Sequence, residues 1–529
     1  MDVTRLIEGL SDPAAYPHPA TDLEIHQTHA SVVFLAGPWA YKVKKPVDLG
    51  FLDFTTLDRR RHACEEEVRL NRRLAPGVYA GVVPITAVDG VLHVGARGTP
   101  LEYAVQMRRL PAEATLEARL GRNEPLEGWM ESLGRRIAEF HGAAAGGADV
   151  SEFGRWAVVA ANARENLAQS RSHVGATLSE EVFERLNVAL ETRLDELRPL
   201  IERRAEAGVP RDTHGDLHLD HVYVFPDERA PDDLVVIDCI EFNRRFRFAD
   251  PVADMAFLAM DLAFHGRRDL EALFVRSYFA AAADIEGLEL LSFYRSYRAA
   301  VRGKVEGMLA AEAEVDAGDR RRAVRRARGH WLLALSELED AVQRPGLVLV
   351  GGLPGTGKSS VARILTDQAG FHVISADRTR KALAGLEATA DAAADFEQGI
   401  YTPEWTERTY QTCLARARDL LFLGQRVLVD ATFAVEARRR AFLDLATESG
   451  VRSRLLLCRA APAVVRARVD ARGEGDSDAD WSIHLQVSGR WEEVSQATLR
   501  HTDEIDSSGT TDDTRSAALK AIGTSGLVG

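Results

Sequence analysis

The stretch of the chain that decides its fold reads Gly352-Leu353-Pro354-Gly355-Thr356-Gly357-Lys358-Ser359. The apolar run 347–350 before it predicts a strand, and residues 360–369 after it predict a helix. A glycine-rich loop in this position lets backbone N–H groups converge on phosphate oxygens at the helix N-terminus. The lysine adds a positive charge between the β- and γ-phosphates, and the serine hydroxyl is a ligand for Mg²⁺. We therefore predict an ATP and Mg²⁺ site made of Gly352, Gly355, Thr356, Gly357, Lys358, Ser359 and Ser360.

Two polar residues, Asp377 and Arg380, follow the next predicted strand, 373–375. Ligands of open α/β sheets bind at this carboxyl edge of the strands. Asp377 can accept the proton of a substrate hydroxyl, and Arg380, one helical turn later, can hold a phosphate or an acceptor group. The alternative is an aspartate that caps a helix, beside a solvated arginine.

A further aspartate, Asp430, ends the predicted strand 427–429. This placement is that of a Walker B aspartate, which contacts Mg²⁺ or water, and the alternative is an aspartate in a simple turn. Downstream, Arg466, Arg468 and Arg472 lie on a predicted helix. A lid helix supplies such an arginine to the transferring phosphoryl group, and the alternative is that each is a solvated surface residue.

Together these motifs resemble the small P-loop kinases related to polynucleotide 5′-hydroxyl kinase and zeta-type toxins, over residues 345–529. The resemblance implies ATP-dependent phosphorylation of a hydroxyl, with Asp377 as the base, and it leaves the acceptor open. Strands and helices alternate over the same residues, which predicts a parallel sheet covered by helices.

A second polar cluster lies earlier in the chain, at His214-Gly215-Asp216-Leu217-His218. Further along, the apolar run 235–237 ends at Asp238. Two carboxylates, each at the end of a short apolar strand, suit a kinase in which one orients the hydroxyl and the other holds Mg²⁺. The alternative is a pair of turn aspartates beside a core histidine.

This cluster is similar to that of the aminoglycoside phosphotransferase family, whose fold is that of protein kinases, over residues 25–310. The resemblance implies that Asp216 is the catalytic aspartate and Asp238 the metal-binding aspartate. It also implies that Lys42 binds phosphate and that Glu67 is its ion-pair partner.

Neighbouring residues leave alternatives for this lysine and this glutamate. Lys44 points to the same strand face as Lys42, because side chains alternate along a strand. Glu65 and Glu66 flank Glu67. The pattern alone therefore does not choose between them.

The cluster departs from the family pattern in two places. The family has an asparagine five residues after the catalytic aspartate, for a second metal, and this chain has His221 there. Neutral histidine can ligate a metal but prefers softer ions than Mg²⁺. No glycine-rich loop precedes Lys42, because residues 28–31 occupy the expected turn. Both departures put phosphate transfer by this half in question.

The whole chain resembles a bacterial family of fused predicted kinases, through strings such as Tyr41–Pro46, 50–54 and Asp238–Asn243. We expect mixed α/β and α+β folds: a two-lobed protein-kinase-like half, followed by a P-loop NTPase domain with a parallel sheet. The expected domains are a small sheet lobe over 1–111, a helical lobe with the catalytic cluster over 112–343, and the P-loop kinase domain over 344–529.

Composition bounds the class of protein. The chain has 529 residues, of which 46% are hydrophobic and 28% charged, as in globular proteins. It contains no uncharged apolar run as long as a membrane helix and no signal-peptide layout at its start, so we expect a cytoplasmic protein with no membrane partner. The net charge of −14 argues against bulk electrostatic binding of nucleic acid.

The leading hypothesis is an ATP-dependent phosphotransferase with two candidate nucleotide sites, using ATP and Mg²⁺. Its acceptor is a small-molecule hydroxyl, with a nucleic-acid 5′ end as a further possibility. One alternative is an active P-loop half joined to a non-catalytic half that recognises substrate or regulates. Another is a nucleotide-gated binding protein. The pattern leaves the oligomeric state open.

Overall fold

The computed structural model describes residues 2–20, 22–50, 52–387, 399–470 and 481–528. Contacts divide the chain into two compact units. The first comprises Met1–Ala160, Leu197–Leu262 and Arg268–Tyr294, and the second comprises Ala161–Glu196, Ala263–Arg267 and Arg295–Gly529. Arg472, one of the candidate lid arginines, lies outside the described residues.

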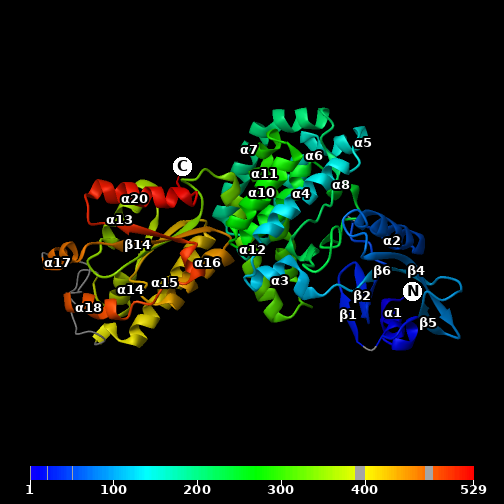
Figure 1. Ribbon diagram of the computed structural model, residues 1–529, viewed down its shortest axis with the longest axis horizontal. Helices are drawn as coiled ribbons and strands as arrows, with labels where there is room; N and C mark the ends of the chain where they lie inside the picture. The colour runs from blue at the N-terminus through cyan, green and yellow to red at the C-terminus, as the bar shows by residue number, and fades with distance from the viewer. Residues whose placement is uncertain (1, 21, 51, 388–398, 471–480, 529) are drawn as a thin grey trace. The chain divides into compact units, whose positions relative to one another are not determined.

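The first unit begins with an antiparallel sheet in the strand order β1-β2-β3-β6-β4-β5. The turn between β2 and β3 uses Gly37 at φ +56°, a left-handed conformation that glycine adopts without a steric cost. Helix α2 packs on strands β4 and β6 (Figure 1), and the Thr56 side chain caps it. The elements are α1 (Val3–Leu10), β1 (Leu23–Gln27), β2 (Ser31–Ala36), β3 (Trp39–Lys44), α2 (Leu57–Asn71), β4 (Tyr79–Val88), β5 (Val91–Val94) and β6 (Glu102–Arg108).

Alternation along β3 sets the direction of its lysines. Tyr41 and Val43 are fully buried in a core cluster with residues of β2 and α1. Lys42 and Lys44 therefore project from the opposite face of the strand, because neighbouring side chains alternate. This is the face on which helix α2 packs, so both lysines reach α2.

Short strands carry the polar cluster of the first unit. Strands β8 and β9 pair antiparallel, with Val222 opposite Val236, and this pairing sets the segments 214–221 and 237–241 side by side. The elements here are α3 (Leu116–Gly121), α4 (Glu127–Ala143), α5 (Ala148–Ser151), β7 (Arg211–Asp212), β8 (Val222–Val224), β9 (Leu234–Val236), α8 (Arg244–Arg247), β10 (Phe248–Ala249) and α10 (Arg268–Ala282). Helices α6 (Trp156–Ser170), α7 (Glu180–Glu206), α9 (Pro251–Phe264) and α11 (Leu291–Ala311) contribute residues to both units.

The second unit is built on a parallel sheet in the strand order β12-β13-β11-β14-β15. Its central strand β11 is buried along its whole length, as expected for a strand covered on both faces. The elements are α12 (Ala317–Leu338), β11 (Gly346–Gly351), α13 (Lys358–Ala369), β12 (His372–Ser375), α14 (Ala376–Leu383), α15 (Pro403–Phe422), β13 (Arg426–Asp430), α16 (Glu436–Glu448), β14 (Arg452–Arg459), α17 (Pro462–Asp470), α18 (Trp481–Gly489), α19 (Gln496–Leu499), β15 (Thr502–Asp506) and α20 (Thr511–Thr524).

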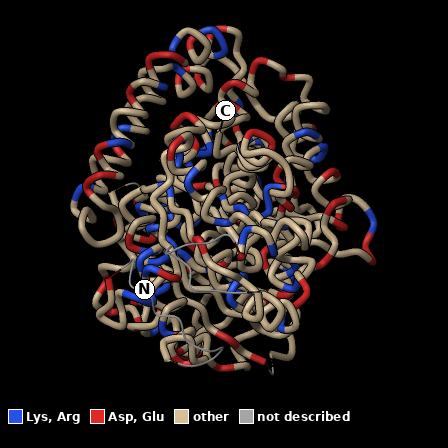
Figure 2. The backbone as a smooth tube through the Cα atoms, turned by 90° about the vertical axis from the view of Figure 1, so that its left-hand side faces the viewer, with Lys and Arg blue, Asp and Glu red and all other residues tan. Residues whose placement is uncertain are grey.

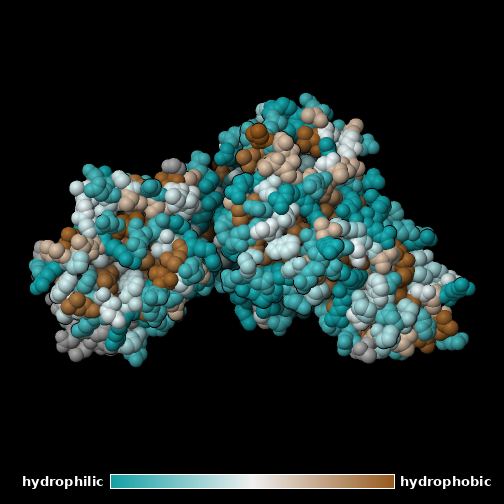
Figure 3. Space-filling view, in the orientation of Figure 1, coloured by the Kyte–Doolittle hydropathy of each residue, from teal (hydrophilic) through white to brown (hydrophobic). Residues whose placement is uncertain are grey.

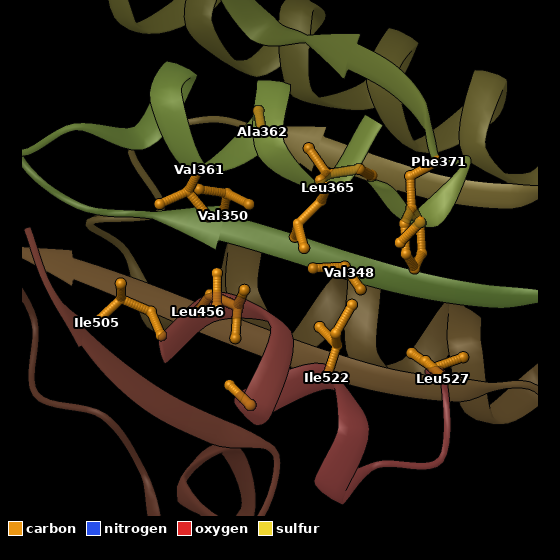
Figure 4. Packing of buried hydrophobic residues seen from close by; sticks show 14 of the residues in the cluster. Val348, Val350, Val361, Ala362, Leu365, Phe371, Leu456, Ile505, Ile522 and Leu527 are labelled. Carbon is orange, nitrogen blue, oxygen red and sulfur yellow. The ribbon is translucent and has the colours of Figure 1, made fainter. Parts of the chain in front are cut away.

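Helices α13 and α20 share one face of this sheet (Figure 4). Val348 and Val350, two residues apart on β11, project to that face together with Leu456 of β14. Leu365 of α13 and Ile522 of α20 pack against them. This core anchors the first turn of α13 at the end of β11.

The predicted mixture of folds is observed: an antiparallel sheet with a helical lobe is followed by a parallel sheet that carries the glycine-rich loop. The strands predicted at 347–350, 373–375 and 427–429 and the helix predicted at 360–369 are present with small shifts in their ends. The sequence did not predict α1, β15 or α20. Strand β15 reads Thr-Asp-Glu-Ile-Asp, in which only Ile505 is apolar, and it forms because it pairs with β14 at the sheet edge. The proposed domain boundaries remain a prediction.

Acidic and basic residues are interspersed along the described backbone (Figure 2). Hydrophilic residues cover most of the face shown in Figure 3. Among the described residues, no helix combines the length and the apolar character that a membrane crossing requires.

Candidate functional site

The loop that carries Asp216 is held by a buried aspartate. Asp254, on α9, accepts hydrogen bonds from the backbone N–H groups of His214 at 2.9 Å and Gly215 at 2.8 Å. Gly215 adopts φ +87°, and a Cβ there would come within 2.8 Å of the Phe246 carbonyl oxygen. The loop therefore requires glycine at this position, and Asp254 holds its backbone in place.

The backbone of Asp238 is also held from the sheet lobe. Asp238 follows β9 and adopts φ +65°, a left-handed conformation that is uncommon for residues other than glycine. Its N–H donates to the Tyr79 hydroxyl at 3.3 Å, and the next N–H, of Cys239, donates to Asn71 Oδ1 at 2.8 Å. Strained backbone of this kind persists where surrounding contacts enforce it, and such positions cluster at functional sites.

A network of buried charges joins β3, α2 and this segment. Glu67 is fully buried and lies 3.0 Å from Lys42 Nζ and 2.5 Å from Lys44 Nζ. Lys42 Nζ also lies 2.5 Å from Asp238 Oδ1, and Lys44 pairs with Glu241. Burial by itself lowers the pKa of Lys42, but the carboxylates of Asp238 and Glu67 outweigh it and hold this pKa well above its ordinary value. Burial also lowers the pKa of Lys44, but Glu241 and Glu67 outweigh it and raise this pKa above its ordinary value, so both lysines are charged in the folded protein.

The structure distinguishes among the three glutamates of α2. Glu65 and Glu66 bind Arg61 and Arg69 on the exposed side of the helix, so only Glu67 faces the lysines. It does not choose between Lys42 and Lys44, because both contact Glu67. Of the two, Lys42 alone contacts Asp238, and its role as the phosphate-binding lysine stays a prediction.

His221 lies between the two carboxylates of the cluster. Its Nδ1 is 3.6 Å from Asp216 Oδ2, and its Nε2 is 3.6 Å from Asp238 Oδ2. The ring of His218 packs beside it at a tilt of 38°, with ring centroids 3.9 Å apart. Burial, and then the neighbouring His218, lower the pKa of His221, so the imidazole is neutral near pH 7. The structure thus brings Lys42, Glu67, Asp216, His221 and Asp238 into one connected cluster.

In the second unit, the glycine-rich loop connects β11 to α13 as predicted. Gly352 and Gly357 adopt φ +142° and +85°, and a Cβ on Gly352 would lie 2.5 Å from the Cys458 carbonyl oxygen. Lys358 Nζ donates to the Leu353 carbonyl at 3.0 Å, so the lysine curls back over the loop. A phosphate group bound in the loop would meet this ammonium group and the first N–H groups of α13.

Ser359 and Asp430 meet at the carboxyl edge of the sheet. The Ser359 hydroxyl donates to Asp430 Oδ2 at 3.2 Å. In the sheet register, Asp430 pairs with Val350 of β11 on one side and Ser375 of β12 on the other. The hydroxyl and carboxylate offer oxygen donors, which Mg²⁺ prefers, so this pair fits the expected ion.

Asp377 and Arg380 lie on α14, just beyond the same edge. Ser375, and not Asp377, caps this helix, so the alternative role of Asp377 as the cap is not observed. Asp377 accepts a hydrogen bond from the Tyr401 hydroxyl at 3.3 Å, and Lys381 Nζ lies 3.5 Å from its other oxygen. Arg380 stacks over the Tyr401 ring at 4.7 Å. Tyr401 thus positions both predicted residues.

Of the candidate lid arginines, Arg468 is engaged behind the loop. It donates to the Ser507 carbonyl at 2.6 Å, and the Ser507 hydroxyl donates to the Thr356 carbonyl at 2.8 Å. Arg466 is 66% exposed and pairs at long range with Asp470. Arg468 therefore supports the loop, and Arg466 is the exposed candidate on α17.

Sequence reasoning missed the residues that hold these sites in place. Asp254, Tyr79 and Asn71 lie far along the chain from the segments whose backbone they bind, and no spacing pattern marks them. Tyr401 and Ser507 are single polar residues without a motif. The only available signal was the aspartate in the apolar helix α9, whose burial calls for a partner.

Comparison with known proteins assigns a class to each half. Residues 51–294 match the model of the phosphotransferase enzyme family, and residues 347–492 match an AAA domain model. The chain is therefore a fused protein with an aminoglycoside-phosphotransferase-like half and a P-loop kinase-like half. It is an ATP-dependent phosphotransferase that acts on hydroxyl groups.

Proteins of similar sequence show the family to which the chain belongs. The chain is 33% identical over 483 residues to "Uncharacterized protein Rv2004c" of Mycobacterium tuberculosis strain H37Rv, covering 91% of this chain and 93% of the relative. The same values hold for "Uncharacterized protein Mb2027c" of Mycobacterium bovis. The chain belongs to the same family as these mycobacterial proteins.

Three similar solved structures have lower sequence identity to the chain than the mycobacterial relatives do. The amicoumacin kinase hAmiN is 11% identical with a TM-score of 0.38, covering 63% of this chain and 93% of its own. A microcompartment-associated aminopropanol kinase is 17% identical with a TM-score of 0.35, covering 63% and 96%. A sugar kinase from Janibacter sp. HTCC2649 is 14% identical with a TM-score of 0.29, covering 35% and 99%.

Proposed function

We propose that the P-loop half is a kinase whose base is Asp377. The observation that carries this proposal is the meeting of Ser359 with Asp430 beside the glycine-rich loop, at the sheet edge where α14 presents Asp377. When bound, Mg-ATP supplies the γ-phosphoryl group and the metal charge that stabilises its transfer. The acceptor hydroxyl oxygen forms a bond to the γ-phosphorus as the bond to the ADP oxygen breaks. Asp377 accepts the hydroxyl proton.

The surrounding residues bind the two substrates and orient the Asp377 carboxylate. Lys358 and the backbone N–H groups of the loop hold the phosphates, and Arg380 holds the acceptor side. Tyr401 and Lys381 fix the Asp377 carboxylate by contacts at 3.3 and 3.5 Å, so its orientation is set before substrate arrives.

Transfer from γ-labelled ATP tests this proposal. Because a positioned base contributes a factor of about 10² to 10⁴, Asp377→Asn should lower kcat by that much while ATP still binds. Lys358→Ala should weaken ATP binding as well. Arg418→Ala, an exposed residue of α15, is the matched control. Full activity in the Asp377→Asn variant would show that another group is the base.

We propose further that the kinase-like half has its own nucleotide site. Lys42 and Glu67 position the nucleotide, Asp216 accepts the proton and Asp238 holds a metal. The connected contacts from Glu67 through Lys42 to Asp238 support this arrangement. In a Lys358→Ala background, Asp216→Ala should abolish the remaining phosphoryl transfer. Residual transfer that Asp216→Ala leaves intact would exclude this site.

A specific observation favours a second candidate for this half. Lys42 binds Asp238 directly, so the two groups that should hold phosphate and metal neutralise each other. The half would then recognise substrate or regulate without catalysis. Titration with a fluorescent ATP analogue separates the two candidates. Two stoichiometric Mg²⁺-dependent sites per chain would show that the kinase-like half binds nucleotide and would contradict the non-catalytic candidate.

We propose a small-molecule hydroxyl as the acceptor, with a nucleic-acid 5′ end as the second possibility. The net charge of −14 supports the small molecule, because polyanions bind through basic surfaces. The domains 1–111, 112–343 and 344–529 stay predictions from the sequence. An untargeted screen of metabolites and RNA with γ-labelled ATP, run on wild type, Asp216→Ala and Asp377→Ala, identifies the acceptor and the half that uses it.

A further inference from the structure

The side chains around Asp216 offer imidazole nitrogens as metal ligands, whereas Mg²⁺ prefers oxygen ligands. Donor atoms of Asp216, His218 and His221 all lie within 4.8 Å of one another. His218 and His221 are buried or nearly so, and Asp216 is open to solvent on one side, with 34% of its side chain exposed. Mg²⁺ takes oxygen ligands, whereas imidazole nitrogen suits first-row transition ions.

Two of the separations in and beside the cluster are close to the edge of a tetrahedral coordination shell. His218 Nε2 lies 3.6 Å from Asp216 Oδ2, and His221 Nε2 lies 3.6 Å from Asp238 Oδ2. These distances exceed those of hydrogen bonds. Two ligands on a tetrahedral ion with metal–ligand bonds of about 2.1 Å lie about 3.4 Å apart, so an ion would fit with small adjustments.

The His221 ring is already oriented as metal-bound histidines are. Its Nδ1 lies 2.9 Å from the Asp216 backbone carbonyl. Because a carbonyl oxygen can only accept, Nδ1 carries the hydrogen and Nε2 keeps its lone pair. Histidines that bind metals commonly donate their other N–H to a backbone carbonyl, which fixes the ring and the tautomer. Here that lone pair faces Asp238 Oδ2.

We propose that Asp216, His218 and His221 bind a divalent first-row transition ion that suits imidazole, such as Zn²⁺, with Asp238 beside it. The ion takes the place of a second Mg²⁺ in the kinase-like half. The proposal rests on the proposed function only in taking Asp216 as the catalytic aspartate of that half. Binding of the ion itself requires no nucleotide and no transfer.

Titration of the metal-free full chain with Co²⁺, without nucleotide, tests the site. Co²⁺ reports nitrogen and oxygen ligation by its visible absorption, and one ion per chain is expected. His221→Asn and His218→Asn should each weaken Co²⁺ binding at least about tenfold, as loss of a metal-site group does. His62→Asn, at an exposed position of α2, is the matched control and should bind as wild type does.

Two further measurements test whether the Co²⁺ site is selective against Mg²⁺ and separate from the P-loop site. A tenfold excess of Mg²⁺ over Co²⁺ should leave the absorption of the wild-type chain unchanged, and this result does not depend on any variant folding. Asp430→Asn should also leave Co²⁺ binding unchanged, because Asp430 belongs to the P-loop site. Absence of Co²⁺ absorption in wild type, displacement by Mg²⁺, loss of binding in Asp430→Asn, or equal binding by folded His221→Asn would each overturn the proposal. Co²⁺ binding in a chain that transfers no phosphate would leave this proposal standing and overturn only the proposed function.

Discussion

At Lys44 a buried ammonium group meets two buried carboxylates. Its side chain is 2% exposed, and those of Glu67 and Glu241 are 0% and 5% exposed. Burial raises the pKa of Glu241 despite the pairing, so this carboxylate depends on Lys44 for its charge. Removing one partner of a buried ion pair leaves an uncompensated charge, which costs more than the pair contributes.

Replacing Lys44 with methionine should therefore destabilise the first unit by about 3 to 5 kcal/mol. Urea unfolding followed by circular dichroism measures this change. The matched control is Lys45→Met, because the Lys45 side chain donates to a backbone carbonyl, that of Thr28, at 2.6 Å and pairs with no carboxylate among the described residues. We expect the control to cost no more than about 1 kcal/mol. Equal losses in the two variants would contradict a structural role for the Lys44 network.

The motif residues of both sites could be predicted, because each lies in a contiguous string or at a strand end. The contacts of Lys44 could not. Strand alternation placed it beside Lys42, but only the packing of α2 shows that Glu67 bridges both lysines. Tyr79 and Asn71 accept hydrogen bonds from the backbone N–H groups of Asp238 and Cys239. They were likewise hidden, because they lie more than a hundred positions away in sequence.

At the scale of elements, helices α11 and α12 are joined by a buried carboxylate. Glu306 of α11 lies 3.0 Å from His330 Nδ1 and 2.9 Å from Arg326 Nε, both on α12. Arg302, one turn earlier on α11, lies 3.4 Å away. Burial raises the pKa of Glu306, but the hydrogen bond from His330 and the arginine charges outweigh it and lower this pKa below 4.5.

The lowered pKa of Glu306 in the folded protein makes its contribution to stability depend on pH. The ionised carboxylate stabilises the folded state at pH values above 4.5, and this contribution is lost as the pH falls through the lower folded pKa. Wild type should therefore exceed Glu306→Gln in stability at pH 7, and the gap should narrow below pH 4.5. Thermal unfolding at a series of pH values measures the gap. Glu314→Gln, at an exposed site, controls for the loss of one carboxylate. A gap that stays constant with pH would show that Glu306 is not ionised in the folded protein.

At the scale of the whole molecule, the second unit begins before the P-loop domain predicted from the sequence. Helix α12 packs on α16 so closely that a Cβ on Gly329 would lie 2.3 Å from the Glu448 carbonyl oxygen. Arg426 of β13 donates to the Ala341 carbonyl at 2.7 Å. A fragment that begins at residue 344 lacks both contacts, because Gly329 and Ala341 precede that residue.

Two fragments test this boundary. Fragment 295–529 should unfold at a temperature at least about 5 °C above that of fragment 344–529, because one kcal/mol corresponds to several degrees in a domain of this size. Differential scanning calorimetry compares them directly. Equal melting temperatures would instead support the boundary at 344 that the sequence predicts.

By itself the sequence determined the two phosphotransferase-type halves and their order, and it located the residues that we propose bind phosphate. It could do so because those groups occupy short strings whose spacing the chemistry constrains, as in the loop from Gly352 to Ser359. The tertiary structure decided which groups hold the motifs in place: Asp254 beneath the Asp216 loop, Tyr401 beside Asp377, and Ser507 behind the P-loop. It also decided that donor atoms of His218 and His221 lie within 4.8 Å of the Asp216 carboxylate. These contacts join segments distant in the chain, so they exist only once strands and helices pack, and no local pattern encodes them.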